Sequence, residues 1–186
     1  MLSAATDRVH VVSVSSSAAH NFSKQQQSSI QLIAGLGVQG DAHAGAAVQH
    51  LYLKRRNAHA PNLMQVHLLP QELLTDIAGH GFPVAPGQLG ENVTTAGIDL
   101  RALPLGTRLH LGSDAVVELT CLRSPCQQIE RFRPGLLQQM VGRDDNGESY
   151  PRVGVMGVVL AGGQVNVSDP IQIVLPAAPH VALTTL

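Results

Sequence analysis

Apolar residues in this chain gather in short runs, many of them β-branched or alternating with polar residues, and this pattern predicts strands. The clearest run is Ala115–Leu122, in which Glu118 and Thr120 alternate with apolar side chains. Shorter runs of the same kind occupy residues 9–14, 30–33, 63–67, 109–111, 153–160, 164–167 and 171–175. We therefore expect a chain that is mainly β.

Helices are predicted at only a few places. Pro70–Gly79 is the best candidate, because proline suits the first turn, Glu72 lies near the N-terminus and Gly79 can end the helix. Weaker helical patterns cover residues 46–56 and 134–141. Many short strands with a few helices predict an α+β chain whose sheet is closed or nearly closed. We expect a single domain over residues 1–176 and a loosely attached tail over residues 177–186.

Composition excludes several classes of protein. The formal net charge of −1 argues against a nucleic-acid binder, which would carry a strong basic excess. No apolar run reaches the roughly 18 residues of a membrane span, and the N-terminus lacks the pattern of a signal peptide. Two cysteines do not make a disulfide framework. We therefore expect a cytoplasmic protein.

The segment Gly35–Gly40 has the spacing of a dinucleotide-binding loop, but its surroundings do not fit that function. Such a loop joins a strand to a helix that binds phosphate, and an acidic residue about 20 positions later binds the ribose. Here Asp41 would place negative charge at the phosphate, and no acidic residue follows it before Glu72. A nicotinamide site is therefore not expected.

Cys126 is the first candidate for chemistry. It leaves the predicted strand on a turn with Pro125, and Arg123 is close enough in sequence to favour the thiolate form that attacks or binds a soft metal. A buried cysteine acting as a small apolar residue is the alternative. Cys121 has that structural role, because it is in phase with Val117 inside the strand.

Two glycine-flanked loops supply further candidates. In Gly40–Gly45, Asp41 and His43 are two residues apart and would share a face of an extended segment. In Gly87–Asn92, Glu91 and Asn92 could fix a ligand or brace a neighbouring loop. Either loop could instead be a structural turn.

Basic residues surround the first loop. Residues 42–71 contain no acidic residue but include Lys54, Arg55, Arg56 and four histidines. Lys24 lies upstream. These cations could line a pocket for a phosphate-bearing ligand or form a solvated basic face.

The order of these motifs resembles the MOSC family, named for the C-terminal domain of molybdenum cofactor sulfurases. The matching segments are Phe22–Lys24, Gly37–Gly45, Pro86–Leu100, Arg123–Cys126, Gly154–Val165 and Asp169–Ile171. This resemblance implies a β-barrel similar to the barrel domain of pyruvate kinase, and a small stand-alone protein of the bacterial type. It also implies that Cys126 binds molybdenum or carries sulfur.

From this resemblance we expect a molybdenum-dependent oxidoreductase that reduces N-hydroxylated compounds, with Cys126 as the metal ligand. Asp41 and His43 would deliver protons, Lys24, Arg55 or Arg56 would hold the phosphate arm of the cofactor, and Arg123, Glu91 and Asn92 would complete its binding. Electrons would come from a separate protein. The alternative is a non-catalytic carrier of cofactor or of persulfide sulfur on Cys126.

Overall fold

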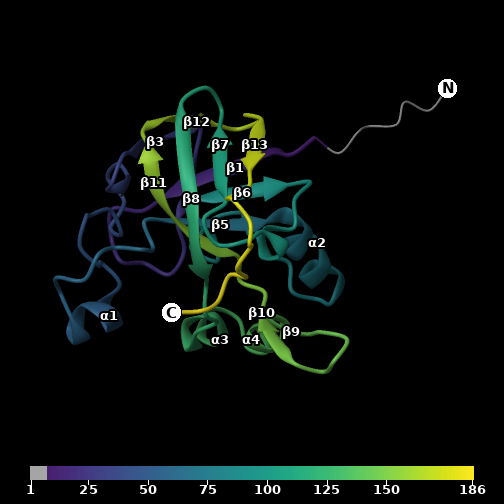
Figure 1. Ribbon diagram of the computed structural model, residues 1–186. Helices are drawn as coiled ribbons and strands as arrows, with labels where there is room; N and C mark the ends of the chain where they lie inside the picture. The colour runs from purple at the N-terminus through teal and green to yellow at the C-terminus, as the bar shows by residue number, and fades with distance from the viewer. Residues whose placement is uncertain (1–7) are drawn as a thin grey trace.

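The computed structural model describes residues 8–186, in which one eight-stranded sheet is joined by two smaller sheets and four short α-helices (Figure 1). In the large sheet β5 and β6 are parallel, and all the other neighbours are antiparallel. Its strands in spatial order are β13 (Ile171–Val174), β7 (Arg108–Leu111), β8 (Ala115–Leu122), β11 (Val155–Ala161), β5 (Val66–Pro70), β6 (Val93–Ala96), β1 (His10–Ser16) and β2 (Gln25–Gln27).

Two smaller sheets accompany the large one. One contains β12 (Gly163–Asn166), β3 (Ser29–Ile33) and β4 (Gly37–Val38), and it covers the core of the large sheet. The other is a hairpin of β9 (Val141–Arg143) and β10 (Ser149–Pro151). The helices are α1 (Leu51–Arg56), α2 (Gln71–Gly79), α3 (Gln127–Phe132) and α4 (Leu136–Gln139), with a 3₁₀ turn η1 at Leu100–Ala102.

The expected closed or nearly closed barrel is wrong, because the large sheet is open. Its edges are β13 and β2, and within residues 8–186 no run of strand pairing joins these edges. His10 and Pro170 form an isolated β-bridge. Farther along the same side of β1, its residues pair with β2. Backbone hydrogen bonds flank the His10–Pro170 bridge, from Ser168 to Val11, from Val11 to Asp169 and from Ile171 to Val9, but they do not extend into strand pairing that would close the sheet.

Two apolar cores hold these layers together. The larger core lies between the eight-stranded sheet and the β12–β3–β4 sheet, with Val117, Leu119 and Leu32 fully buried. The second core packs α2, α3 and α4 against the end of β5, around Ile77 and Ile129. Because α3 follows β8 directly, this second core fixes the direction in which the chain leaves the strand.

Most predicted elements occur, with shifted ends. The strand Ala115–Leu122 is found at the predicted residues, and the predicted helix Pro70–Gly79 is α2. Helix α1 covers only the last part of residues 46–56, and α4 is shorter than residues 134–141. The Gly35–Gly40 segment forms turns around the short strand β4 and leads into no helix, as expected for a loop that does not bind a dinucleotide. The start of the predicted domain, residues 1–7, lies outside the described residues.

Residues 177–186 are not loosely attached. Leu183 is buried in the larger core, and the carbonyl of Thr184 accepts a hydrogen bond of 2.9 Å from the backbone N–H of Leu122. Ala182 bridges Pro104. In Figure 1 this segment runs past the end of β8 and ends between α1 and α3. Over the part of the chain that the structure describes, no helix has the length and apolar character needed to cross a membrane.

Candidate functional site

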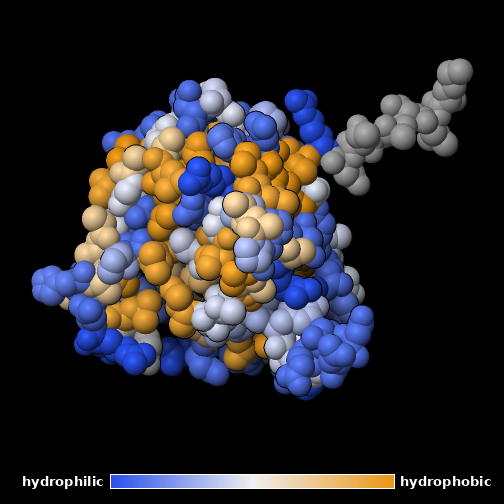
Figure 2. Space-filling view, viewed as in Figure 1, coloured by the Kyte–Doolittle hydropathy of each residue, from blue (hydrophilic) through white to orange (hydrophobic). Residues whose placement is uncertain are grey.

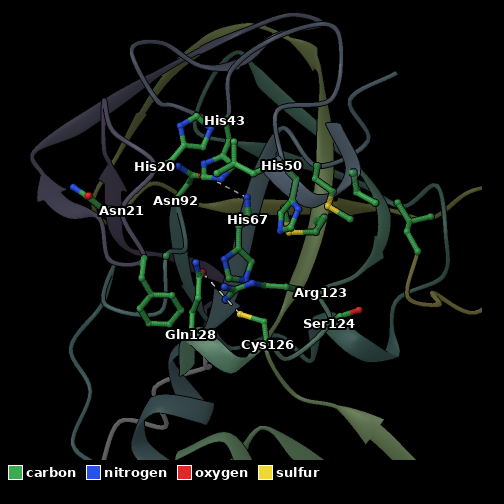
Figure 3. A pocket seen from close by; sticks show the side chains of 17 residues that line it. His20, Asn21, His43, His50, His67, Asn92, Arg123, Ser124, Cys126 and Gln128 are labelled. Carbon is green, nitrogen blue, oxygen red and sulfur yellow. Dashed lines mark hydrogen bonds between the residues drawn. The ribbon is translucent and has the colours of Figure 1, made fainter. Parts of the chain in front are cut away.

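A cavity of about 320 Å³ opens beside the end of β8, between α1 and the start of α3. Its volume is at the lower end of the range of pockets that bind small molecules. Apolar side chains form much of its wall, and its polar lining residues are His20, Asn21, His43, His50, His67, Asn92, Arg123, Ser124, Cys126 and Gln128 (Figure 3). The lining side chains include Arg123 and no Asp or Glu, so the side chains of the described cavity suit an anionic ligand.

The Arg123–Cys126 turn brings a cation and a thiol to the same side of the cavity. The backbone N–H of Arg123 donates to Gly154, which continues the pairing of β8 with β11 for one more residue. The Arg123 guanidinium donates a hydrogen bond of 2.7 Å to the carbonyl of Leu89. Burial lowers the pKa of Arg123, whereas negative charge at Cys126 and Glu91 would raise it. The guanidinium is therefore fixed at the site.

Cys126 is the residue immediately before α3, and its side chain is partly exposed in the cavity. Its Sγ atom lies 4.0 Å from Oε1 of Gln128. In Figure 3 the sulfur lies beside His67 and Arg123. Cys121, by contrast, is fully buried, and burial raises the pKa of its thiol. The two cysteines thus have the different environments that the sequence predicts.

His67 is buried in the wall of the cavity and is neutral. Its Nε2–H donates a hydrogen bond of 2.7 Å to the carbonyl of Val153. Burial holds the pKa of His67 well below its ordinary value, and the charge of Arg123 lowers it further. The backbone N–H of His67 donates to the side chain of Asn92, which ties β5 to the Gly87–Asn92 loop.

A buried ion pair lies directly behind His43. The ammonium group of Lys24 is 2.6 Å from Oδ2 of Asp41, and the same oxygen accepts a hydrogen bond of 3.1 Å from Asn92. Oδ1 of Asp41 accepts from the backbone of His43 at 2.9 Å and lies 3.3 Å from its Nδ1. Burial opposes ionisation of Asp41, but the bonds from His43 and the charge of Lys24 outweigh it and hold its pKa far below the ordinary value.

This arrangement gives the His43 ring a fixed orientation. Because an ionised Asp41 accepts at the Nδ1 side, the Nε2 side of the ring is left for the cavity. The ring of His20 lies 5.2 Å from that of His43, measured between ring centroids. His50 lies close to both in Figure 3, and burial lowers its pKa, with further lowering by the positive charges of His43, Arg123 and His20.

Glu91 has a different position from the one expected of a ligand-binding residue. Its carboxyl group is completely buried, and Oε1 accepts hydrogen bonds from the backbone of Gly87 and the hydroxyl of Thr94. Oε2 has no hydrogen-bond partner. Burial raises the pKa of Glu91. Glu91 therefore braces the Gly87–Asn92 loop, and its neighbour Gly90 reaches the cavity instead.

The predicted site residues fall into four groups. Cys126, His43, Asn92 and Arg123 line the cavity together. Asp41 and Lys24 lie behind the cavity wall, where Lys24 is held by Asp41 rather than directed to a ligand. Arg55 and Arg56 are exposed on α1, which contributes Leu51 and Leu53 to the cavity but neither arginine. Glu91, as described above, is buried elsewhere.

The sequence argument did not single out His20, His50 or His67. A sequence signal existed for His50 and His67, because both belong, with His43, to the four histidines of residues 42–71, the stretch without acidic residues. What could not be read from sequence is that β5 and α1 bring these histidines to one cavity. His20 comes from a separate loop after β1, and no pattern in the sequence marks it.

Chemically, the cavity suits an anionic cofactor that carries a soft metal. A thiol is a ligand for such metals, a guanidinium holds phosphate or other oxyanions, and neutral imidazoles donate or accept hydrogen bonds. In the described residues no group of three or more His, Cys, Asp or Glu side chains is arranged to hold a metal ion alone. The residues present therefore fit a metal that is bound within a cofactor and contacted by one cysteine.

The fold and the site define a β-rich protein that presents one thiol in a cationic pocket. The chain belongs to the MOSC domain family, whose pattern it matches over residues 55–172, more than half of its length. This family is associated with binding of the molybdenum cofactor. No curated protein matches the sequence.

Solved structures share the fold at low sequence identity. The YuaD protein from Bacillus subtilis is 22% identical with a TM-score of 0.71, over 89% of this chain and 95% of that one. YiiM from Escherichia coli is 22% identical with a TM-score of 0.62, over 94% of this chain and 73% of that one. YiiM from Geobacillus stearothermophilus is 17% identical with a TM-score of 0.63, over 94% and 80% of the two chains. These similarities establish the fold and carry no activity to this chain.

Proposed function

We propose that this protein binds the molybdenum cofactor with the Cys126 thiolate as a metal ligand and reduces N-hydroxylated compounds. The observation that carries the proposal is the position of Cys126, which shares with Arg123 and His43 a cavity that no Asp or Glu side chain lines. Thiolate, fixed cation and oriented imidazole are the groups that such a reaction needs from the protein.

The residues for holding the cofactor follow from their surroundings. Cys126 supplies the soft ligand, and Arg123 faces the anionic groups. Neutral His67 adds no positive charge there and supports the wall through its bond to Val153. Lys24 acts on Asp41 instead of on phosphate, and Arg55 and Arg56 lie outside the cavity on α1. When bound, the cofactor supplies the two-electron redox chemistry.

Proton delivery is the task of the protein. Reduction of R–NHOH to R–NH₂ consumes two electrons and two protons and releases water, with cleavage of the N–O bond. His43 is the proton donor in this proposal, because Asp41 fixes its Nδ1 side and its other nitrogen faces the cavity. Asp41 also stabilises the protonated imidazole by its negative charge. The electrons come from a separate electron-transfer protein, and the substrate is a small molecule.

The test is retention of molybdenum and pterin after incubation with free molybdenum cofactor. We expect near-stoichiometric retention by the wild type and loss in Cys126→Ala. Cys121→Ala is the matched control, since it removes a thiol that is buried outside the cavity. A wild type that retains the cofactor is then assayed with an artificial electron donor and N-hydroxylated bases.

Three results would contradict the proposal in different ways. Equal failure of wild type and Cys126→Ala to retain cofactor would overturn cofactor binding. Retention without reductase activity would instead favour a carrier of cofactor. Gain of one sulfur atom on Cys126, without bound molybdenum, would favour a persulfide carrier, and intact-mass measurement distinguishes this outcome.

A further inference from the structure

Residues 181–186, here named the C-terminal strap, pair with the end of the strand that carries the site. Strand β7 pairs with β8 only from Arg108 to Leu111. Beyond that point the backbone N–H of Leu105 donates to Val181, and the N–H of Leu122 donates to Thr184. Thr185 also forms a parallel bridge with Leu122. The strap thus continues the pairing of β8 where β7 no longer covers it.

The strap is anchored at its middle and exposed at its end. Leu183 is 6% exposed and packs in the larger core, whereas Leu186 is 61% exposed. Leu186 nevertheless lines the same cavity as Cys126. The burial of Leu183 and the contacts of Thr184 and Thr185 with Leu122 therefore hold Leu186 at the cavity, although its side chain is largely exposed. Leu122 is one residue before Arg123, so the strap is tied to the turn that presents the thiol.

Leu186 is one of several apolar residues that form one wall of the cavity. Leu51 and Leu53 come from α1, and Met64 and Met156 from the sheet side. In Figure 1 the strap ends between α1 and α3, the helices on either side of the opening. In Figure 2 hydrophilic side chains lie at the outer end of α1, at the lower left, while Leu51, which is 55% exposed, and Leu53 line the cavity. Apolar side chains of this kind discriminate between ligands by size and shape.

From these contacts we infer that the C-terminal strap determines which molecules reach Cys126, with Leu186 limiting the size of the apolar part of the substrate. Access to the thiol does not depend on bound cofactor, whereas the limit on substrate size rests on the proposed function. A smaller side chain at position 186 widens the opening, and a larger one narrows it. The strap backbone stays in place in both cases, because Leu183 and Thr184 are unchanged.

The test compares alkylation of Cys126 by a small reagent, iodoacetamide, and a bulky one, N-(1-pyrenyl)maleimide. Peptide mass spectrometry separates Cys126 from buried Cys121. In Leu186→Ala we expect the ratio of bulky to small reagent rates to rise several-fold, and in Leu186→Trp to fall several-fold. Val181→Ala and Val181→Trp are the matched controls, since Val181 is 59% exposed in the same strap but does not line the cavity.

An unchanged ratio in both Leu186 variants would overturn the inference, and so would equal changes in the Val181 controls. The proposed function fails separately, through loss of cofactor retention, so the two failures are distinguishable. If the wild type does reduce N-hydroxylated bases, Leu186→Ala is expected to lower KM for bulky substrates more than for small ones. Its cofactor content is expected to equal that of the wild type.

Discussion

Lys24 and Asp41 form an ion pair of 2.6 Å in which both side chains are almost completely buried. A buried charge that loses its partner costs far more than an exposed one. Asp41 has other donors, from Ser17, His43 and Asn92, but its contact with the ammonium group of Lys24 is the shortest of these four. The ion pair therefore stabilises the fold and also holds the carboxylate that orients the His43 ring.

Lys24→Met is expected to lower the free energy of unfolding by about 3 kcal/mol or more, because it leaves the Asp41 carboxylate buried without a counter-charge. The matched control is Lys54→Met, which changes an exposed lysine on α1 and is expected to stay within about 0.5 kcal/mol of the wild type. Urea unfolding at neutral pH measures both. Equal small losses in the two variants would show that the buried pair does not stabilise the fold.

The same variant changes the response to acid. Because the pKa of Asp41 is lowered in the folded state, its contribution is complete above the ordinary value of 3.8 and is lost as pH falls below it. Lys24→Met removes one cause of that lowering. The difference in stability between wild type and variant should therefore shrink as pH falls through this range.

Glu91→Gln is expected to gain stability relative to the wild type as pH rises. Burial raises the pKa of Glu91, so the wild type loses stability as pH increases above the ordinary value of 4.5, where the unfolded chain ionises more readily. Glutamine keeps an acceptor for Gly87 and Thr94 without a charge. Urea unfolding at pH 5 and pH 8 measures the difference between the proteins. A difference that is constant with pH would contradict the assigned role of the carboxyl group.

Gly154→Ala is expected to lower the free energy of unfolding by about 3 kcal/mol or more. Gly154 has φ +81°, and an added Cβ would overlap the carbonyl of Leu68 and approach Nε2 of His67 at 3.1 Å. Gly147→Ala is the control, because Gly147 has φ +82° but nothing within 4 Å of its added Cβ. Its loss should be about 1 kcal/mol. Thermal unfolding of the two variants separates backbone strain from close packing.

His43→Gln is expected to lower turnover with an artificial electron donor by about 100-fold while cofactor content stays the same. The variant keeps a polar side chain but loses the group that carries a proton. His59→Gln is the control, because His59 belongs to the same basic stretch and does not line the cavity. Equal activity of the two variants would remove His43 from the proposed reaction. This prediction rests on the proposed function, unlike the four before it.

Local sequence was sufficient to predict much of the secondary structure. Ala115–Leu122 and Pro70–Gly79 have strong alternation or clear end signals, and both occur as predicted. The openness of the sheet depends on which distant strands pair, and a pattern of short strands carries no information about that. Helix α3 was not predicted, because Gln127–Phe132 gains its stability from Ile129 in the second core rather than from a strong helical pattern.

The candidate site was predictable where chemistry and turn signals coincide. Cys126 follows a strand and a proline, and His43 lies between glycines, so both were singled out and both line the cavity. The role of Lys24 could not be predicted, because its contact with Asp41 spans 17 positions and depends on the folded chain. Sequence identified Lys24 as a cation but could not show that an internal carboxylate holds it.

The position of the C-terminal strap has a practical consequence for handling the protein. A peptide tag or fluorescent protein fused after Leu186 would begin at the entrance to the cavity, beside α1 and α3. Such a fusion would partly cover Cys126 while leaving Leu183 buried and the fold intact. Weak cofactor loading of a C-terminally tagged preparation would then reflect the blocked entrance, and cleavage of the tag should restore the loading.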